Sequence, residues 1–133
     1  MAGPVNIADL PFACGEAVTK FHAVKLVAGG LLNMCDTQGE RALGIVQETV
    51  SADDAAAGRI VAVRPAHCGG VSRAIAGAEI TTYMSEVTVG ADGRIEPADS
   101  GDVVLGFNLN VTTTTGGDGD HIDVLLGGGY TKA

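Results

Sequence analysis

Residues 41–47 read Arg-Ala-Leu-Gly-Ile-Val-Gln, and residues 103–109 read Val-Val-Leu-Gly-Phe-Asn-Leu. The two stretches lie 62 positions apart, and each places a Leu-Gly pair before an apolar residue. The same offset, applied without gaps, aligns further like residues, namely Gly15 with Gly77, Thr19 with Thr81, Val27 with Val89, Gly39 with Gly101 and Ile60 with Ile122. Glycines coincide at turn positions and apolar residues at strand positions, so the sequence predicts two similar halves.

Each half is expected to contain the same series of short strands, rich in Val, Ile, Thr and Leu and separated by Gly, Asp or Asn. The predicted strands are Ala17–Phe21, Val24–Val27, Arg41–Gln47 and Arg59–Arg64 in the first half, and Glu79–Tyr83, Glu86–Val89, Val103–Asn110 and His121–Leu126 in the second. Asp92-Gly93, between Val89 and Ile95, indicates a tight hairpin. The segment Ser51–Ala57 is either a short helix, capped by Ser51 or Asp53 and ended by Gly58, or a loop.

These patterns predict an all-β fold, either a small β-barrel or a β-sandwich, built from two similar halves. The chain has 133 residues, which suit one compact domain, and its core should consist of Val, Ile, Leu and Ala because Trp is absent and aromatic residues make up only 4%. The predicted β-rich body covers residues 13–126, with pseudo-repeats at about 13–64 and 75–126. A short tail follows at residues 127–133, where three glycines break the last strand.

Residues 1–12 form a predicted extended N-terminal arm that lies outside the repeats. The segment contains two prolines, and Pro11 excludes a helix through it. Its apolar side chains are Val5, Ile7, Leu10 and Phe12. We therefore expect the arm either to pack on the body or to reach a neighbouring molecule, with these four residues as the candidate interface.

Charge and hydropathy argue against nucleic acid and membrane as partners. Sixteen acidic residues against eight basic ones give a formal net charge of −8, whereas a nucleic-acid-binding protein needs a basic surface to displace counterions from phosphate. No apolar run approaches the roughly 20 residues of a membrane span, and the N-terminus does not read as a signal peptide. We expect a soluble protein made inside the cell, with neither nucleic acid nor membrane as a partner.

Neither cysteines nor histidines form a recognisable catalytic or metal-binding pattern. Cys14, Cys35 and Cys68 are an odd set at wide spacing, which indicates reduced thiols rather than zinc ligands or a disulfide framework. The remaining chemical candidates are the histidines His22, His67 and His121. The adjacent pair His67-Cys68 would point to opposite faces of a strand, so we do not expect it to act as a catalytic dyad.

A calcium site is the strongest metal candidate in the sequence. Asp118, Asp120 and Asp123 lie close together in a glycine-rich stretch, and calcium prefers such carboxylate ligands. Asp-Gly is also ordinary turn chemistry, and the motif occurs once rather than as stacked repeats. We expect turns here and predict that the protein is not an enzyme and carries no cofactor or metal.

Three runs in the first half, residues 10–18, 42–47 and 55–63, together with residues 76–80, 104–108 and 119–125 in the second, resemble the small decoration or cement proteins of tailed-phage heads. The resemblance covers about residues 10–126, and its order and spacing are more specific than any single motif. It implies a β-rich body on the outer surface of the head, a trimer that clamps neighbouring capsomers, the major capsid protein as partner, and synthesis in the host cytoplasm. It offers no catalytic residues to transfer. The loop 112–120 and the tail 127–133 depart from the family pattern.

Two other classes of function are less well supported by the sequence. A small β binding module, for carbohydrate or for attachment to a host surface, would need an exposed aromatic platform. The aromatic residues Phe12, Phe21, Tyr83, Phe107 and Tyr130 are few and are mostly expected on inward-facing strands. An enzyme would need an oriented nucleophile or an acid–base pair, which the sequence does not show. The sequence thus favours a structural virion protein.

Overall fold

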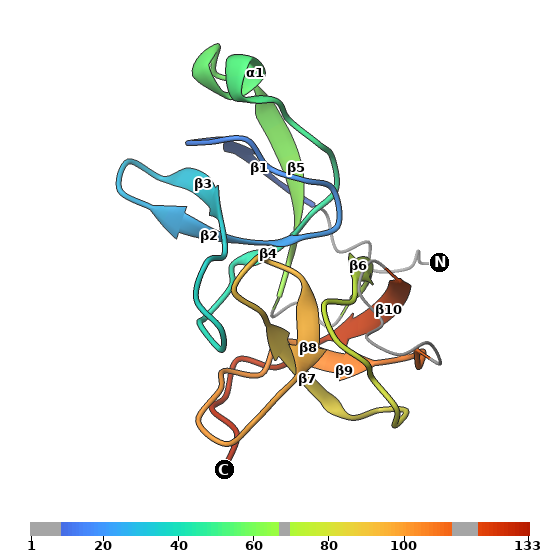
Figure 1. Ribbon diagram of the computed structural model, residues 1–133. Coiled ribbons are helices and arrows are strands. Elements are labelled where there is room, and N and C mark those ends of the chain that lie inside the picture. Colours follow the sequence, from blue (N-terminus) through green and yellow to red (C-terminus); the bar gives the residue numbers. More distant parts are fainter. Residues whose placement is uncertain (1–8, 67–69, 113–119) are drawn as a thin grey trace, which may run out of the picture.

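The computed structural model describes residues 9–66, 70–112 and 120–133. Within these ranges the chain forms ten strands and one short helix, which confirms the predicted all-β class (Figure 1). The first sheet contains, in spatial order, β1 (Leu10–Ala13), β5 (Ile60–Pro65), β4 (Gly44–Val46), β2 (Ala23–Val27) and β3 (Leu31–Met34). The second contains β6 (Val71–Ile75), β10 (His121–Leu126), β9 (Gly106–Asn108), β7 (Glu86–Val89) and β8 (Ile95–Pro97). We call the first sheet with its loops the N-lobe and the second the C-lobe.

Both lobes have the same strand order, and each N-lobe strand has its counterpart five strands later. Residue pairing across the strands gives the offsets. With Gly44 matched to Gly106, their partners Pro65 and Leu126 set β5 and β10 61 residues apart. Leu10 then pairs with Val63 as Ser72 pairs with Val124, so β1 and β6 differ by 62 residues. In the same way Val24 pairs with Met34 as Val87 pairs with Pro97, an offset of 63 for both strands.

The ungapped offset of 62 is therefore one residue wrong for several strands. It matched Val27 with Val89, whereas the pairing matches Leu26 with Val89, and it matched Ile60 with Ile122, whereas Ile60 corresponds to His121. Single-residue differences in the connecting loops cause these shifts. The Gly44–Gly106 match at offset 62 agrees with the pairing, because Gly44 faces Pro65 as Gly106 faces Leu126.

Each sheet curls until its two edge strands meet at one point. The amide of Gly15, just after β1, donates to the carbonyl of Leu32 in β3 at 2.7 Å, and the amide of Gly77, just after β6, donates to the carbonyl of Ile95 in β8 at 2.8 Å. Each contact is a single parallel bridge rather than a ladder. The sequence left a small β-barrel and a β-sandwich as alternatives. Neither sheet closes into a barrel, because its edge strands share only this single bridge.

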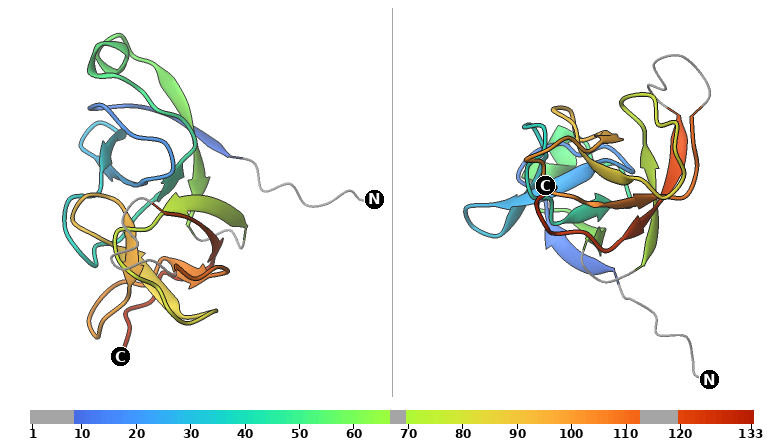
Figure 2. Two further views of the ribbon diagram at one scale, coloured as in Figure 1. Left: turned by 45° about the vertical axis from the view of Figure 1, so that its right-hand side comes forward. Right: turned by 90° about the horizontal axis from the view of Figure 1, so that it is seen from below.

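The lobes lie one above the other, with α1 (Ala52–Ala56) at one end of the molecule and the C-terminus near the other (Figures 1 and 2). Adjacent residues on β4 point to opposite faces of the sheet. Val46 lies in the core of the N-lobe, whereas Ile45 joins a cluster made mainly of C-lobe residues. Ala23, Cys35, Ala42 and Ala66 of the N-lobe belong to the same cluster, so one apolar core spans both lobes.

Several predicted elements agree with the structure. Glu86–Val89 and His121–Leu126 are strands with the predicted bounds, and a hairpin containing Asp92-Gly93 joins β7 to β8. The helical alternative for Ser51–Ala57 is confirmed as α1, because the hydroxyl of Ser51 accepts the amide of Asp54 at 3.2 Å and caps the helix.

Two predicted strands are wrong. Residues Ala17–Phe21 and Glu79–Tyr83 are not strands in the structure. In the first segment Val18 makes only an isolated bridge with Val50, and the extended path ends at a left-handed residue, Phe21 with φ of 65° in the N-lobe and its counterpart Met84 with φ of 56° in the C-lobe. A strand cannot continue through such a residue.

The predicted N-terminal arm also needs correction. Residues Leu10–Ala13 form β1, so positions 10–12 belong to the N-lobe sheet rather than to an arm. Pro11 is tolerated because β1 is an edge strand that pairs only with β5. Residues 1–8 lie outside the described residues, and the outer boundary of the arm stays a prediction.

The C-terminal segment is docked along the C-lobe. Val103 and Thr131 form an antiparallel bridge, and the amide of Val104 donates to the carbonyl of Tyr130 at 2.8 Å. Lys132 and Asp102 continue this pairing through a 2.8 Å backbone hydrogen bond. The segment predicted as a tail thus places Tyr130 and Lys132 beside β7.

Glu96 on β8 gives a testable pH dependence. Burial, with the negative charges of Asp92, Asp102 and Asp99, raises its pKa above the ordinary 4.5. At a pH between 4.5 and the higher pKa of the folded state, the folded chain keeps a proton on Glu96 that the unfolded chain has released. The free energy of unfolding should therefore fall as the pH rises through this window. Glu96→Gln is expected to gain up to about 1 kcal/mol of unfolding free energy at pH 7, and nothing below pH ~4, in urea titrations. Glu79→Gln at an exposed site is the control; an equal gain there would contradict the assignment.

Candidate functional site: a groove on the C-lobe

The predicted interface residues are only partly placed by the structure. Val5 and Ile7 lie outside the described residues. Leu10 is exposed on β1, and Phe12, on the same strand, packs against the core of the N-lobe. Phe12 therefore contributes to the packing of the N-lobe, and the interface role of Val5, Ile7, Leu10 and Phe12 stays a prediction.

Among the described residues, the sequence candidates for catalysis and metal binding do not come together in one site. His67, Cys68 and Asp118 lie outside the described residues. His121 packs edge-to-face on Phe21, with ring centres 6.0 Å apart, and burial raises the pKa of the Cys35 thiol to about 12. Within residues 9–66, 70–112 and 120–133, no three His, Cys, Asp or Glu side chains are arranged to hold a metal ion. In the same ranges, no helix is both long and apolar enough to cross a membrane.

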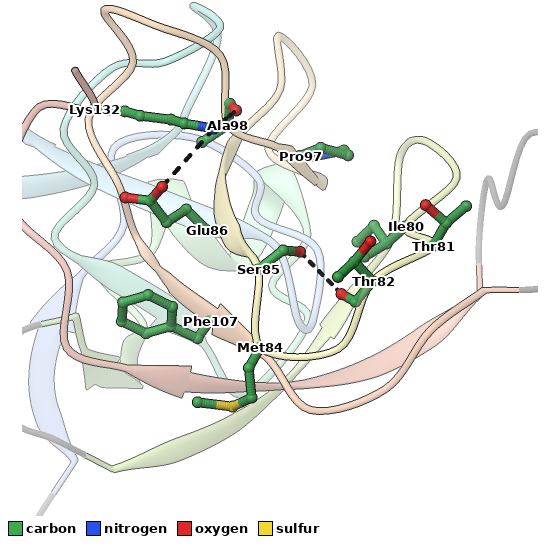
Figure 3. A pocket seen from close by; sticks show the side chains of 10 residues that line it. All are labelled: Ile80, Thr81, Thr82, Met84, Ser85, Glu86, Pro97, Ala98, Phe107 and Lys132. Atoms are coloured by element: carbon green, nitrogen blue, oxygen red, sulfur yellow. Dashed lines mark hydrogen bonds and ion pairs between the residues drawn. The ribbon is translucent and has the colours of Figure 1, made fainter.

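A groove of about 460 Å³ lies on the C-lobe, which the sequence did not indicate (Figure 3). Segment 80–86, β9, the end of β8 and the C-terminal segment enclose it. Its lining residues are Ile80, Thr81, Thr82, Met84, Ser85, Glu86, Pro97, Ala98, Phe107 and Lys132. Figure 3 shows Met84 and Phe107 together on one side, and Glu86 and Lys132 together on another. The groove thus joins an apolar wall to a charged one.

The charged wall is fixed by the docked C-terminal segment. Lys132 Nζ donates to the carbonyl of Ala98 at 3.0 Å and lies 3.8 Å from Glu86 Oε1. Tyr130 donates its hydroxyl to Glu86 Oε2. This hydrogen bond raises the pKa of Tyr130, so the phenol is neutral at physiological pH. The wall therefore presents a paired cation and anion rather than a net charge.

The loop that carries Met84 is fixed by the buried side chain of Asn108. Asn108 Oδ1 accepts the amide of Ser85 at 2.8 Å, and Nδ2 donates to the carbonyl of Thr82 at 2.8 Å. Ser85 Oγ lies 2.7 Å from the same amide oxygen. Ser85 Oγ also donates to the carbonyl of Thr82 at 3.0 Å, and neither of these oxygens takes up a proton at neutral pH, so neither acts as a general base for this hydroxyl. The groove offers shape, apolar contact and hydrogen bonds.

Aromatic residues border the groove more openly than the sequence indicated. Tyr83 is 64% exposed and Tyr130 is 45% exposed, although both tyrosines were counted among aromatics mostly expected to face inward. Tyr83 is the last residue of the predicted strand Glu79–Tyr83, which does not form, and Tyr130 lies in the docked C-terminal segment. Both positions depend on long-range packing that local patterns do not encode.

The equivalent face of the N-lobe is covered by the C-lobe. Ala23 pairs with Ile45 as Glu86 pairs with Phe107, and Ala23 and Ile45 are fully buried whereas Glu86 and Phe107 are partly exposed. The covering element is the β7–β8 hairpin. The carbonyl of Gly93 at its tip accepts the amide of Ala23 at 2.8 Å. The tip therefore covers the N-lobe face that corresponds to the open groove of the C-lobe.

Gly93 allows a test of this docking. A Cβ at Gly93 would lie 3.1 Å from the carbonyl oxygen of Ala23, and φ at Gly93 is 82°. Gly93→Ala is expected to lower the unfolding free energy by about 2–4 kcal/mol, the sum of left-handed strain and overpacking. Gly30→Ala is the matched control, because Gly30 has a similar φ of 74° and no atom within 4 Å. It should cost only about 1–2 kcal/mol. Equal losses in chemical denaturation would show that the hairpin tip is not tightly docked.

The chain resembles a known protein in its structure. No protein-family model matches the chain, and no curated protein matches it. Among solved structures, the chain is similar to the N base of the head fiber gp8.5 of bacteriophage phi29, with a TM-score of 0.66 and 15% sequence identity. The match covers 89% of this chain and 92% of that chain. This likeness shows the fold. It includes nearly the whole of both chains, so the two-lobed arrangement is shared with a protein of a phage head.

Proposed function

We propose that the chain is a structural protein of a phage virion, carried on the outer surface of the head. The observation that supports this most is the likeness to the phi29 head-fiber base, which extends over both lobes at a TM-score of 0.66. The sequence resembles decoration proteins of phage heads, whereas the similar solved structure is the base of a head fiber. Both are proteins of the phage head, but they are different kinds of protein. The finer role, a cement protein that binds the major capsid protein as a trimer, is part of the proposal.

The physical character of the chain fits such a role. Its strands enclose an apolar core that spans both lobes, which gives a rigid body suited to repeated contact rather than to closure on a substrate. The formal net charge of −8 disfavours binding to packaged nucleic acid and favours solubility before assembly. A repeated body on a symmetric shell needs only modest affinity per copy, because oligomerisation multiplies the contacts.

The test is co-sedimentation with purified heads that lack the protein. Saturable binding, with a copy number fixed per head, is the expected result. The control is the same assay with free capsid protein that has not assembled, since a surface site between capsomers exists only on the shell. Binding that rises without saturation, or no binding, would contradict the proposal.

The N-terminal segment is tested in the same assay. Because Leu10–Ala13 is a strand of the N-lobe, the informative deletion is residues 2–8, which leaves β1 complete. If the segment adds a strand or an apolar contact on the capsid, this deletion abolishes head binding while the circular dichroism spectrum is unchanged. Undiminished binding would remove Val5 and Ile7 from the proposed interface.

The alternative function, a small β binding module displayed on a virion, is favoured by one observation. Tyr83 and Tyr130 are exposed beside the groove, and exposed aromatic rings are typical contacts for sugars. Titration of the tyrosine fluorescence with host-surface glycans distinguishes the two functions. A saturable signal without head binding would favour the module.

A further inference from the structure

The two lobes of one chain are joined by a contact that has two sides. On the N-lobe side, Ala23 and Ile45 form the covered face. On the C-lobe side lie Val89, Leu105 and the hairpin tip at Gly93. Val89 also accepts, at its carbonyl, the amide of Gly39 at 2.9 Å. Each side has a counterpart on the other lobe, because the two lobes share one fold.

The counterpart of the N-lobe side is the open groove on the C-lobe. Ala23 corresponds to Glu86, and Ile45 corresponds to Phe107. The left-handed residue Phe21 corresponds to Met84, since their amides donate to Val46 and Asn108, which are themselves counterparts. Phe21 is partly buried at the junction between the lobes, whereas Met84 is 53% exposed.

The counterpart of the C-lobe side is also open. The β2–β3 hairpin matches the β7–β8 hairpin residue for residue, and Gly30 donates to Val27 as Gly93 donates to Gly90, at 3.0 and 3.1 Å. Leu26 corresponds to Val89, yet Leu26 is 45% exposed and Val89 only 1%. Beside Leu26 lies a hollow of about 270 Å³ lined by Leu26, Arg41, Ala42 and Leu43.

We propose that the β2–β3 hairpin of a second copy of this chain docks in the C-lobe groove. The contact would repeat between molecules the one that joins the two lobes within a molecule. Leu26 of one copy would then be covered in the same way as its counterpart Val89. Met84 and Phe107 of the other copy would be covered in the same way as their counterparts Phe21 and Ile45. Ala28, Gly29 and Gly30 form a tip with little side-chain bulk, which suits entry into a groove.

Such a contact is heterologous, because a different surface of each copy takes part. Repetition of a heterologous contact closes into a ring when the rotation allows and otherwise continues as a chain. A ring of three copies would present six similar lobes. The inference rests on the proposed self-association and names the surfaces that carry it.

The first experiment is light scattering after gel filtration of three variants. Leu26→Asp and Met84→Asp place a charge on either side of the contact, and Asp tolerates the left-handed backbone at position 84. Both are expected to convert the oligomer to monomer. The control is Ile60→Asp at a residue that is 56% exposed at the start of β5, outside both surfaces, and it should leave the mass unchanged. Circular dichroism checks that each variant is folded.

The second experiment is disulfide cross-linking in a Cys68→Ser background. Leu26→Cys and Met84→Cys proteins are oxidised separately and as a mixture. A covalent dimer that forms chiefly in the mixture supports the contact. An oligomer that survives both aspartate variants and does not cross-link in the mixture would overturn the inference while leaving self-association intact. A wild-type protein that stays monomeric at ~100 µM would overturn both, and head binding would then be judged by co-sedimentation alone.

Discussion

Replacing Gly44 by alanine is expected to lower the free energy of unfolding by more than about 4 kcal/mol, a large part of the total stability of a chain of this size. A Cβ at this position would overlap the carbonyl oxygen of Arg64 and lie 2.8 Å from its carbonyl carbon. Both atoms belong to the backbone of β5. That strand is paired with β4 on one side and β1 on the other, so it cannot move aside without breaking a ladder.

The counterpart Gly106 should behave in the same way, because a Cβ there would overlap the carbonyl oxygen of Leu125 in β10. Gly127→Ala is the control, since its Cβ would meet no atom within 4 Å, and we expect a change within about 0.5 kcal/mol. Urea denaturation followed by circular dichroism measures all three. A Gly44→Ala protein as stable as Gly127→Ala would show that the strands do not approach as described.

Replacing Ile45 by alanine is expected to cost about 2–5 kcal/mol, the range for a large aliphatic side chain removed from a packed core. Ile45 is fully buried in the cluster that spans both lobes. Ile60→Ala is the matched control, because Ile60 is the same residue type on the neighbouring strand but is largely exposed. We expect it to cost less than about 1 kcal/mol.

The same variant tests whether the lobes unfold together. Tyr83 and Tyr130 both lie in the C-lobe, and the chain contains no Trp, so tyrosine fluorescence reports on the C-lobe alone. Because Ile45 belongs to the N-lobe but packs in the shared core, its loss should move the fluorescence midpoint as far as the circular dichroism midpoint. A fluorescence midpoint that stays at the wild-type value would mean that the lobes are energetically independent.

Local patterns predicted the strands whose residues alternate or cluster strongly. The runs at Glu86–Val89 and His121–Leu126 are β-branched and apolar, and both are strands with those bounds. Leu10–Ala13 contains a proline and Leu31–Met34 an asparagine, so neither is typical of a strand in sequence. These two are edge strands, and pairing with a partner far along the chain decides their conformation.

The groove could not be predicted because distant segments build it. The left-handed turn at Met84 depends on a hydrogen bond to Asn108, and the charged wall depends on the return of the C-terminal segment. One signal was present in the aligned halves. Ile45 in the first half stands against Phe107 in the second, and this change from an aliphatic to an aromatic residue indicates that the two faces have different surroundings. The match of Ala23 with Glu86 was hidden, because it needs the offset of 63 that only the strand pairing shows.

The central claim is that the chain acts as a building block on the surface of a phage head. Cryo-electron microscopy of the virions that carry it tests this most directly. The account predicts two-lobed density of this fold on the outer surface, at positions that follow the symmetry of the shell. Heads whose outer surface carries no such density, although the protein is abundant in the infected cell, would contradict it.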